Sequence, residues 1–135
     1  MFEDSEKKEF FARCQQNNFI SAELKLLNRL DQLIEVNFKL HKDCNYYASC
    51  LSISLKVLNR ITMHNRGLTV FSMVQARIYK EAVALLRESS MSIKQINYEL
   101  GVDDPAYFSR RFKMLVGCSP SEFRKVVGVK IIYAG

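Results

Sequence analysis

The sequence predicts an all-helical fold, and three observations support this prediction. Apolar residues recur mostly at helical spacing, and few segments favour strands. The chain has 2 prolines, Pro105 and Pro120, and each follows a residue that can cap the N-terminus of a helix. With 135 residues, 48% of them hydrophobic, the chain fits one domain or two small ones that share a connection.

The N-terminal part is expected to hold a polar segment followed by a packing helix. Residues 1–20 are polar and charged, which is typical of a linker or a frayed helix. Residues 21–38 form the expected helix, which Ser21 can cap. Its apolar residues, near i, i+3, i+4 spacing, are Leu24, Leu27, Leu30, Ile34 and Phe38.

Caps and stops place the next three helices. Asp43 can cap a helix that ends near Leu51. Ser54 can cap another, which Gly67 would end in a left-handed conformation. Thr69 can cap a long helix over residues 69–88, whose apolar stripe is Val70, Val74, Ile78, Ala82 and Leu85. Residues 21–88 are therefore expected to form a first subdomain with a long joining helix.

Residues 89–127 are expected to form a second subdomain of three helices. Ser92 and Gln95 form a capping box, and Gly101 ends the helix that they begin. The next helix begins at Pro105 after the cap Asp104 and ends at Gly117. Another capping box, Ser119 with Glu122, opens a last helix to about Val127. Residues 128–135 are expected to form a tail, for which the sequence predicts no particular structure.

The two subdomains repeat one pattern. At an offset of 49 or 50 residues, caps, turn residues, apolar anchors, arginines and glycine stops recur in the same order. The matching pairs are Asp43 with Ser92, Ala48 with Asn97, Leu51 with Leu100, Ser52 with Gly101, Leu58 with Phe108, Arg60 with Arg110, Gly67 with Gly117 and Thr69 with Ser119. Each copy reads as a helix-turn-helix, a unit that places its second helix in the DNA major groove.

The chain resembles the DNA-binding domain of the AraC/XylS family of bacterial transcription regulators over roughly residues 24–127. The residues that carry the resemblance are Ser92 to Ile96, Tyr98 to Gly101, Asp104 to Arg110, Phe112-Lys113, and Gly117 with Ser119 to Arg124. The resemblance implies about seven helices, as two helix-turn-helix subdomains joined by a long helix. It also implies that residues 1–20 are the last part of a linker between two domains. The chain is then a stand-alone regulator or the DNA-binding portion of a larger one.

Three positions depart from the family pattern. Asn97 stands where the family usually has a small alanine at the helix crossing, so its amide needs a partner or access to solvent. Val102 replaces a phenylalanine. Ser52 replaces the glycine of the first turn, which costs roughly 1 kcal/mol if that turn needs a positive φ.

The charge of the chain favours an acidic partner. Its net charge is +6, and its pI is near 9.2. Residues 1–40 carry 6 Lys/Arg against 7 Asp/Glu, whereas residues 41–135 carry 14 against 7. The excess positive charge therefore lies with the two helix-turn-helix units, which makes double-stranded DNA the expected partner.

Helical spacing and the resemblance both indicate which residues would read DNA bases. With Leu58 and Ile61 inward in the first unit and Phe108 and Phe112 inward in the second, polar stripes face outward. The base-reading residues expected on these stripes are Lys56, Asn59, Arg60, Ala106, Ser109 and Arg110. Arginine can bond guanine with two donors, and asparagine can bond adenine in the same way.

Phosphates need only positive charge and free backbone N–H groups, which helix N-termini supply. The expected phosphate contacts are Ser54, Arg66, Thr69, Lys113, Ser119, Arg124 and Lys125. The long helix of 20 residues would span ~30 Å, close to the ~34 Å between successive major-groove segments. One chain could then read two unlike subsites.

Other classes of function have little support in the sequence. No cofactor, metal site or small-molecule site is expected, because the four cysteines form no C-x-x-C pair and no phosphate-binding loop is present. Aromatic residues such as Tyr47, Phe71, Phe108, Phe112 and Phe123 fall at core spacing rather than forming a base-stacking surface. The chain is therefore not expected to be an enzyme.

The N-terminus is acidic and no apolar run could cross a membrane, so a cytoplasmic location is expected. The leading hypothesis is a sequence-specific regulator of duplex DNA that reads two adjacent major-groove segments. The alternative is a degenerate helical module that acts on another regulator or on RNA polymerase without binding DNA tightly.

Overall fold

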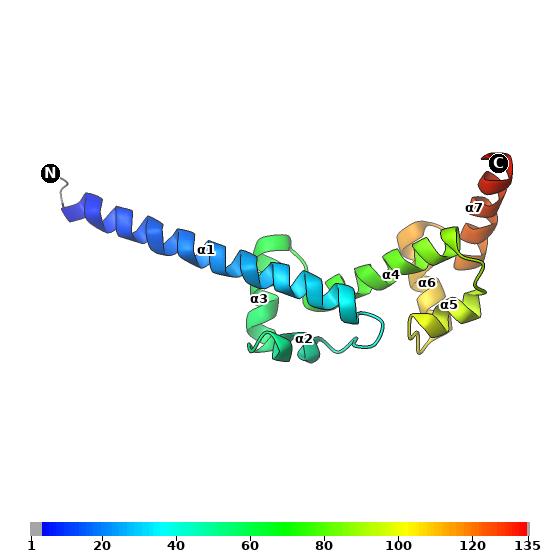
Figure 1. Cartoon of the computed structure of the whole chain (residues 1–135), viewed down its shortest axis with the longest axis horizontal. Coiled ribbons are helices and arrows are strands. Elements are labelled where there is room, and N and C mark those ends of the chain that lie inside the picture. The colour runs from blue at the N-terminus through cyan, green and yellow to red at the C-terminus, as the bar shows by residue number, and fades with distance from the viewer. Residues whose placement is uncertain (1–3, 135) are drawn as a thin grey trace. The chain divides into compact units, whose positions relative to one another are not determined.

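The computed structural model describes residues 4–134, although not the side chains at positions 11, 14 and 128–134. Every regular element in that range is a helix (Figure 1), so the all-helical prediction is confirmed. The helices are α1 Asp4–Asn37, α2 Cys44–Cys50, α3 Leu55–Arg66, α4 Val70–Glu88, α5 Ile93–Glu99, α6 Pro105–Val116 and α7 Pro120–Ala134.

Two helices are longer than the sequence patterns indicated. The segment expected to be a linker or frayed helix, residues 1–20, is part of α1 from Asp4 onward. No glycine or proline interrupts α1, so nothing in the backbone ends the helix before Asn37. The expected tail is likewise helical, because α7 continues through Gly128 to Ala134. A single glycine weakens a helix by about 1 kcal/mol relative to alanine without having to end it.

The chain divides into two compact units. Unit 1 comprises Met1–Val36 and Asp43–Val70, and unit 2 comprises Asn37–Lys42 and Phe71–Gly135. The expected division after residue 88 therefore differs from the observed one. Almost all of α4 belongs to unit 2, and so does the short segment that follows α1 in the chain.

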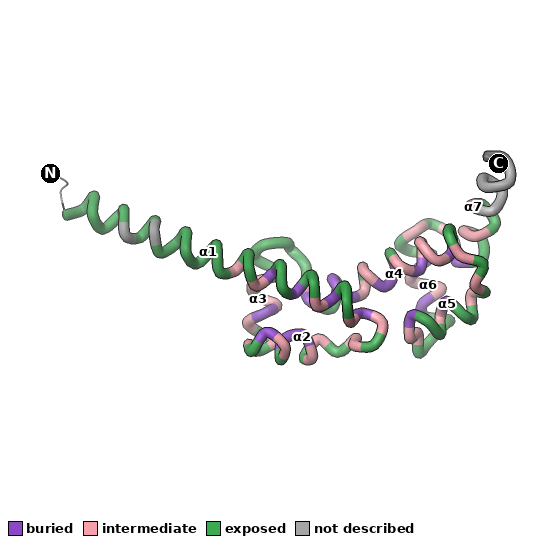
Figure 2. The backbone as a smooth tube through the Cα atoms, in the orientation of Figure 1, coloured by how far each residue is buried: buried purple, intermediate pink, exposed green. Residues whose placement is uncertain are grey.

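The core of unit 1 forms where the C-terminal half of α1 meets α2 and α3. Figure 2 shows that the described residues in the N-terminal half of α1 are exposed, whereas buried positions alternate with exposed ones in its C-terminal half. Thr62, rather than the expected Ile61, is fully buried, and its hydroxyl donates to the Asn59 carbonyl at 3.1 Å. Leu24, expected to pack inward, is 51% exposed. The buried residues of this unit are Leu27, Leu30, Ile34, Tyr47, Ala48, Leu51, Leu58, Thr62 and Val70.

The core of unit 2 is richer in aromatic rings. The Tyr79 and Phe108 rings stack with centroids 4.8 Å apart, and Phe112 meets Phe123 edge to face at 6.0 Å. Phe71 was expected in the core but is 56% exposed. The buried residues are Phe38, Met73, Val74, Ile78, Tyr79, Ala82, Leu86, Ile96, Leu100, Phe108 and Phe112.

Among the described residues, none of the helices combines the length and the apolar character that spanning a membrane requires.

Candidate nucleic-acid interface

In unit 1, side-chain caps define the ends of α2 and α3. Asp43 accepts from the Asn45 backbone N–H at 3.0 Å, and Ser54 accepts from that of Val57 at 3.2 Å. Gly67 ends α3 with φ 67°, and its N–H donates to the Met63 carbonyl at 2.9 Å. Each cap satisfies a helix-end group that has no partner within the helix. These predicted caps and the glycine stop are confirmed.

In unit 2, the corresponding caps define α5 and α6. Ser92 and Gln95 exchange reciprocal hydrogen bonds of 3.1 and 2.8 Å, which is the predicted capping box. Asp104 accepts from the Tyr107 N–H at 3.0 Å, and Pro105 is the first residue of α6. Gly117 then ends α6 with φ 101°. The sequence therefore positions both second helices by local interactions.

The turn between the two helices has the same conformation in both units. Ser52 has φ 59° and Gly101 has φ 65°. The next residue in each turn donates its N–H back to the preceding helix, from Ile53 to Ala48 at 3.1 Å and from Val102 to Asn97 at 2.8 Å. The first turn thus does need a positive φ, and its serine adopts a conformation that costs roughly 1 kcal/mol for a residue with a Cβ.

Asn97 does not create a buried polar defect. Its side chain is half-buried, and no buried side-chain nitrogen or oxygen in the described part of the chain lacks a partner. A partly exposed amide can keep its hydrogen bonds with water, which removes most of the cost of placing it at a helix crossing.

On α3, the outward stripe is only partly available to a ligand. Lys56, Arg60 and Met63 are exposed, and Leu58 is fully buried as predicted. Asn59 is half-buried, and its side-chain oxygen accepts from the Val70 N–H at 3.0 Å. The amide oxygen therefore caps α4. This arrangement does not support the expected adenine contact of Asn59, which would need both the oxygen and the nitrogen of the amide.

On α6, the outward stripe is open. Ala106, Arg110 and Lys113 are exposed, and Ser109 is half-buried. Met114, 75% exposed, follows Arg110 by one helical turn and extends the stripe. Sequence reasoning omitted Met114, although its i+4 spacing from Arg110 could have identified it.

Unlike Asn59, Ser109 has no helix to cap. The residue that corresponds to Val70 in unit 2 is Pro120, which begins α7 and has no backbone N–H. Instead, α7 carries its own capping box, in which Ser119 and Glu122 exchange hydrogen bonds of 3.1 and 3.2 Å. The Ser109 hydroxyl is therefore not required for the start of the next helix.

The predicted phosphate contacts differ in how much of their charge is available. Lys113 and Lys125 are exposed, and Ser54, Thr69 and Ser119 lie at helix N-termini as expected. Arg66, however, forms a two-bond ion pair with Asp31, at 2.6 and 2.7 Å. The hydrogen bonding of the Arg66 guanidinium to the Asp31 carboxylate is the largest cause that raises the pKa of Arg66. Its charge is thus largely balanced within unit 1.

Arg124 was expected to contact phosphate, but the structure gives it an internal role. Its guanidinium donates to the carbonyls of Leu86 at 3.3 Å, Leu85 at 3.2 Å and Ser89 at 3.2 Å, and also to that of Met91. These carbonyls lie at and just beyond the C-terminus of α4, where a cation is favoured by the helix dipole. The expectation fails because longer-range contacts engage all three nitrogens of the guanidinium.

The described residues do not include a cluster of metal ligands. No three His, Cys, Asp or Glu residues gather there closely enough to hold an ion. Cys44, Cys50 and Cys118 are free thiols, and burial, with a contribution from Asp43, raises the pKa of Cys44.

Comparisons with known proteins agree with this geometry. Residues 47–126 match the family described as "Helix-turn-helix domain". The Arabinose operon regulatory protein of Escherichia coli is 35% identical over 94 residues, covering 70% of this chain and 31% of that protein. The Msm operon regulatory protein of Streptococcus mutans is 28% identical over 101 residues, which cover 75% of this chain and 36% of that protein. The chain thus spans about a third of the length of these relatives.

Solved structures show the same fold. The C-terminal domain of AraT, a response regulator from Geobacillus stearothermophilus, superposes with a TM-score of 0.68 at 26% identity, covering 75% of this chain and 84% of that one. The C-terminal domain of the response regulator yesN from Fusobacterium nucleatum gives 0.66 at 19% identity, covering 72% and 95%. With the match over residues 47–126, these findings show that the chain belongs to the AraC/XylS family of helix-turn-helix DNA-binding domains.

Proposed function

We propose that this chain is the DNA-binding part of a transcription regulator, and that it reads two adjacent major-groove segments, one with α3 and one with α6. The observation that carries the proposal is the pair of exposed arginines, Arg60 and Arg110. They occupy matching positions on two helices that share the same caps, turn and glycine stop.

Both arginines have their guanidinium groups available. In the described part of the chain, none of the ion pairs involves Arg60 or Arg110, whereas Arg66 is held by Asp31. A guanidinium without an internal partner can donate two hydrogen bonds to O6 and N7 of guanine. We therefore assign guanine reading to Arg60 and Arg110.

The neighbouring side chains would set the rest of each subsite. Next to Arg60, α3 presents the long cation Lys56, whereas α6 presents the small Ala106 and the hydroxyl of Ser109 near Arg110. A methyl-sized residue suits an apolar contact with thymine, and a hydroxyl can bond to several bases. Because the two stripes differ, the proposed site is asymmetric, with two unlike halves about ten base pairs apart, one turn of the duplex.

Phosphate binding would come from charges and N–H groups outside these stripes. Lys113 and Lys125 supply exposed charge, and Ser54, Thr69 and Ser119 mark helix N-termini that can face phosphates. Glu122 bonds to the Ser119 N–H, which makes the α7 terminus the weakest of the three. We leave Arg124 out of this group because α4 and the segment after it occupy its donors.

The test is a titration of the chain against duplexes selected from a random pool, at two salt concentrations. Affinity should fall steeply with salt, with a slope of about −0.9 in log K against log salt for each phosphate contact. Arg110→Ala should cost ~1–3 kcal/mol on the best site and relax preference at one base pair. Arg60→Ala should do the same at a position in the other half of the site.

Lys125→Ala is the matched control, because it removes one exposed charge without touching a base-reading stripe. It should weaken all sequences alike and lower the salt slope by about one. If both arginine variants merely shift affinity uniformly, they do not read bases. Tolerance of five extra base pairs between the halves would exclude two-segment reading. Absence of salt-dependent binding would favour a role through another regulator or RNA polymerase.

A further inference from the structure

The segment Asn37–Lys42 contacts the turn of the second helix-turn-helix unit at several points. It lies 59–60 residues before that turn in the sequence, yet it belongs to unit 2. Phe38 anchors it, because this ring is only 4% exposed and the Arg77 guanidinium lies 4.3 Å from its centroid. Burying a phenylalanine stabilises a contact more than a surface ion pair does.

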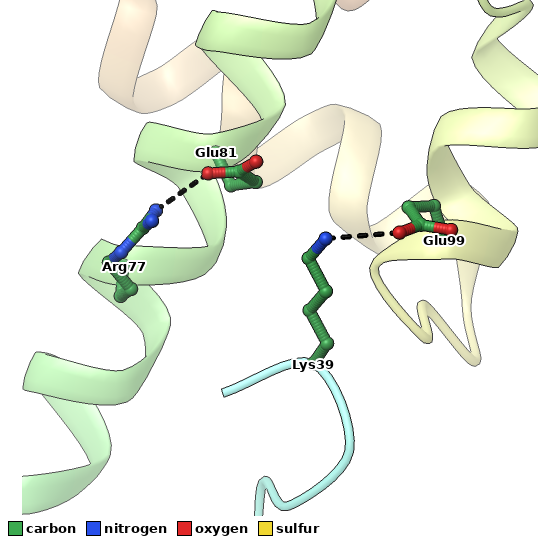
Figure 3. A network of polar contacts seen from close by, with 4 residues as sticks. All are labelled: Lys39, Arg77, Glu81 and Glu99. Atoms are coloured by element: carbon green, nitrogen blue, oxygen red, sulfur yellow. Dashed lines mark hydrogen bonds and ion pairs between the residues drawn. The ribbon is translucent and has the colours of Figure 1, made fainter. Parts of the chain in front are cut away.

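Two lysines extend from this anchor to the turn. Lys39 forms an ion pair with Glu99 at 3.0 Å, and both side chains are partly exposed. The Lys42 ammonium donates to the backbone carbonyl of Gly101, the turn residue itself. Figure 3 shows Lys39 reaching Glu99 across from the Arg77–Glu81 pair, which joins two residues of α4 at 3.0 Å.

Steric evidence supports the same close approach. A Cβ added to Gly101 would lie 3.0 Å from the Lys39 carbonyl oxygen and 3.0 Å from the Lys42 ammonium. Contacts of this length are tighter than most that a Cβ makes, so a side chain at position 101 would force the Lys39 backbone or the Lys42 side chain to shift. This crowding favours glycine for a second reason besides the positive φ of 65°. The matching residue in unit 1, Ser52, has a side chain and is exposed.

From these contacts we infer that the segment Asn37–Lys42 is a clasp that holds the α5–α6 turn, with Lys42 as a residue that positions the recognition helix α6. The turn carries α6 directly: Asp104, its N-cap, is three residues after Gly101. Burial lowers the pKa of Lys42, and the nearby Asp103 opposes this effect. The ammonium is thus partly withdrawn from water to reach the turn. The role of α6 in DNA reading rests on the function proposed above.

The experiment compares three variants of the full chain. Lys42→Met removes the donor and keeps the length of the side chain, and Lys42→Arg restores a donor. Lys80→Met is the matched control, because Lys80 is an exposed lysine of α4 and its loss changes the net charge equally.

Amide hydrogen exchange tests the clasp without DNA. The Gly101 and Val102 amides bond locally to the carbonyls of Tyr98 and Asn97, so their exchange reports opening of the turn. In Lys42→Met they should exchange about fivefold faster, the factor expected for one net hydrogen bond. The amides of Ser52 and Ile53, in the corresponding turn of unit 1, should be unchanged in the same sample. Lys42→Arg and Lys80→Met should exchange like the parent chain.

DNA binding tests the positioning role. Lys42→Met should reduce discrimination in the half of the site that Arg110→Ala relaxes, and leave the other half unchanged. Lys80→Met should affect both halves alike. Unchanged exchange at Gly101 and Val102 in Lys42→Met would overturn the clasp, whether or not the chain binds DNA. Faster exchange with unaltered discrimination would overturn the positioning role alone. If the parent chain does not bind DNA with salt dependence, the proposed function fails while the exchange result still decides on the clasp.

Discussion

The two helix-turn-helix units share their caps, their turn and their glycine stops, but they hold the following helix in different ways. In unit 1, the Asn59 side chain accepts a hydrogen bond from the Val70 N–H, so a residue of α3 caps the N-terminus of α4. In unit 2, Pro120 needs no acceptor, and Ser119 with Glu122 caps α7 locally. Local capping leaves Ser109 on α6 without a structural task, whereas the matching Asn59 has one. A repeat in sequence therefore does not imply a repeat in function, position by position.

A second difference lies in the cores and the turns. Thr62, buried in unit 1, corresponds to Phe112 in unit 2, where aromatic rings pack together. The turn of unit 2 is covered by the segment Asn37–Lys42, while Ser52 in the turn of unit 1 is exposed. Unit 2 thus combines more buried aromatic rings with a turn that a segment distant in the sequence covers. We expect it to be less tolerant of substitution at matching positions.

The largest expected effect is at Arg124. The residue at the matching position of the first sequence repeat is the fully buried Val74, whose apolar side chain cannot donate such hydrogen bonds. Arg124→Ala leaves carbonyls at and after the end of α4 without their donor and should destabilise the chain by about 3 kcal/mol, because hydrogen bonds from charged groups are the stronger ones. Urea unfolding followed by circular dichroism measures this loss. The neighbouring Lys125→Ala should stay within about 0.5 kcal/mol. Equal losses for both variants would contradict the capping role.

The next effect concerns the two turns. Gly101→Ala should cost about 2 kcal/mol, because it adds the strain of a positive φ to a close contact with the Lys39 carbonyl. Ser52→Gly should stabilise unit 1 by up to about 1 kcal/mol, since it relieves the same strain where the turn is exposed. Thermal and urea unfolding of both variants test this asymmetry. If Gly101→Ala lowers the free energy of unfolding no more than a typical surface substitution does, the segment Asn37–Lys42 does not closely cover this turn.

A smaller effect should separate the two recognition helices. Asn59→Ala removes the cap of α4 and should cost about 1 kcal/mol of stability. Ser109→Ala at the matching position should change stability by less than about 0.5 kcal/mol, because Pro120 has no N–H to satisfy. Asn59→Asp keeps an acceptor oxygen and serves as the control, with most of the stability retained. A stability loss for Ser109→Ala equal to that for Asn59→Ala would show that the two helices are held alike.

The smallest effect is expected at Asn97, whose counterpart in unit 1 is the buried Ala48. Asn97 is half-buried, so its replacement by alanine loses little, and alanine favours a helix over asparagine by up to about 0.7 kcal/mol. Asn97→Ala should therefore be neutral or slightly stabilising in denaturant unfolding. A loss above about 1 kcal/mol would reveal a hydrogen bond that this side chain makes within unit 2.

Most of the fold could be predicted because its signals are local. Ser54, Ser92 and Asp104 each bond to a backbone N–H within three residues, and Gly67 and Gly117 end their helices through their own φ angles. Helix ends could not be predicted where no such signal is present: α1 already includes Asp4, well before the expected cap Ser21, and Gly128 does not end α7. In the candidate site, too, features set by local spacing could be predicted, whereas those set by long-range contacts could not. The exposure of Arg60 and Arg110 agrees with helical spacing, whereas the internal roles of Asn59 and Arg124 do not follow from it.

The sequence by itself determined the presence of the seven helices in residues 4–134, most of their caps, the turns and the outward faces of α3 and α6, because each depends on residues within about one helical turn of one another. Only the tertiary structure decided which polar side chains remain available to a ligand. Arg66 is paired with Asp31, 35 residues away, and Arg124 bonds to carbonyls 33–39 residues away. Lys42 bonds to a turn 59 residues away. A long flexible side chain can reach many partners, so its partner is set by packing rather than by spacing in the sequence.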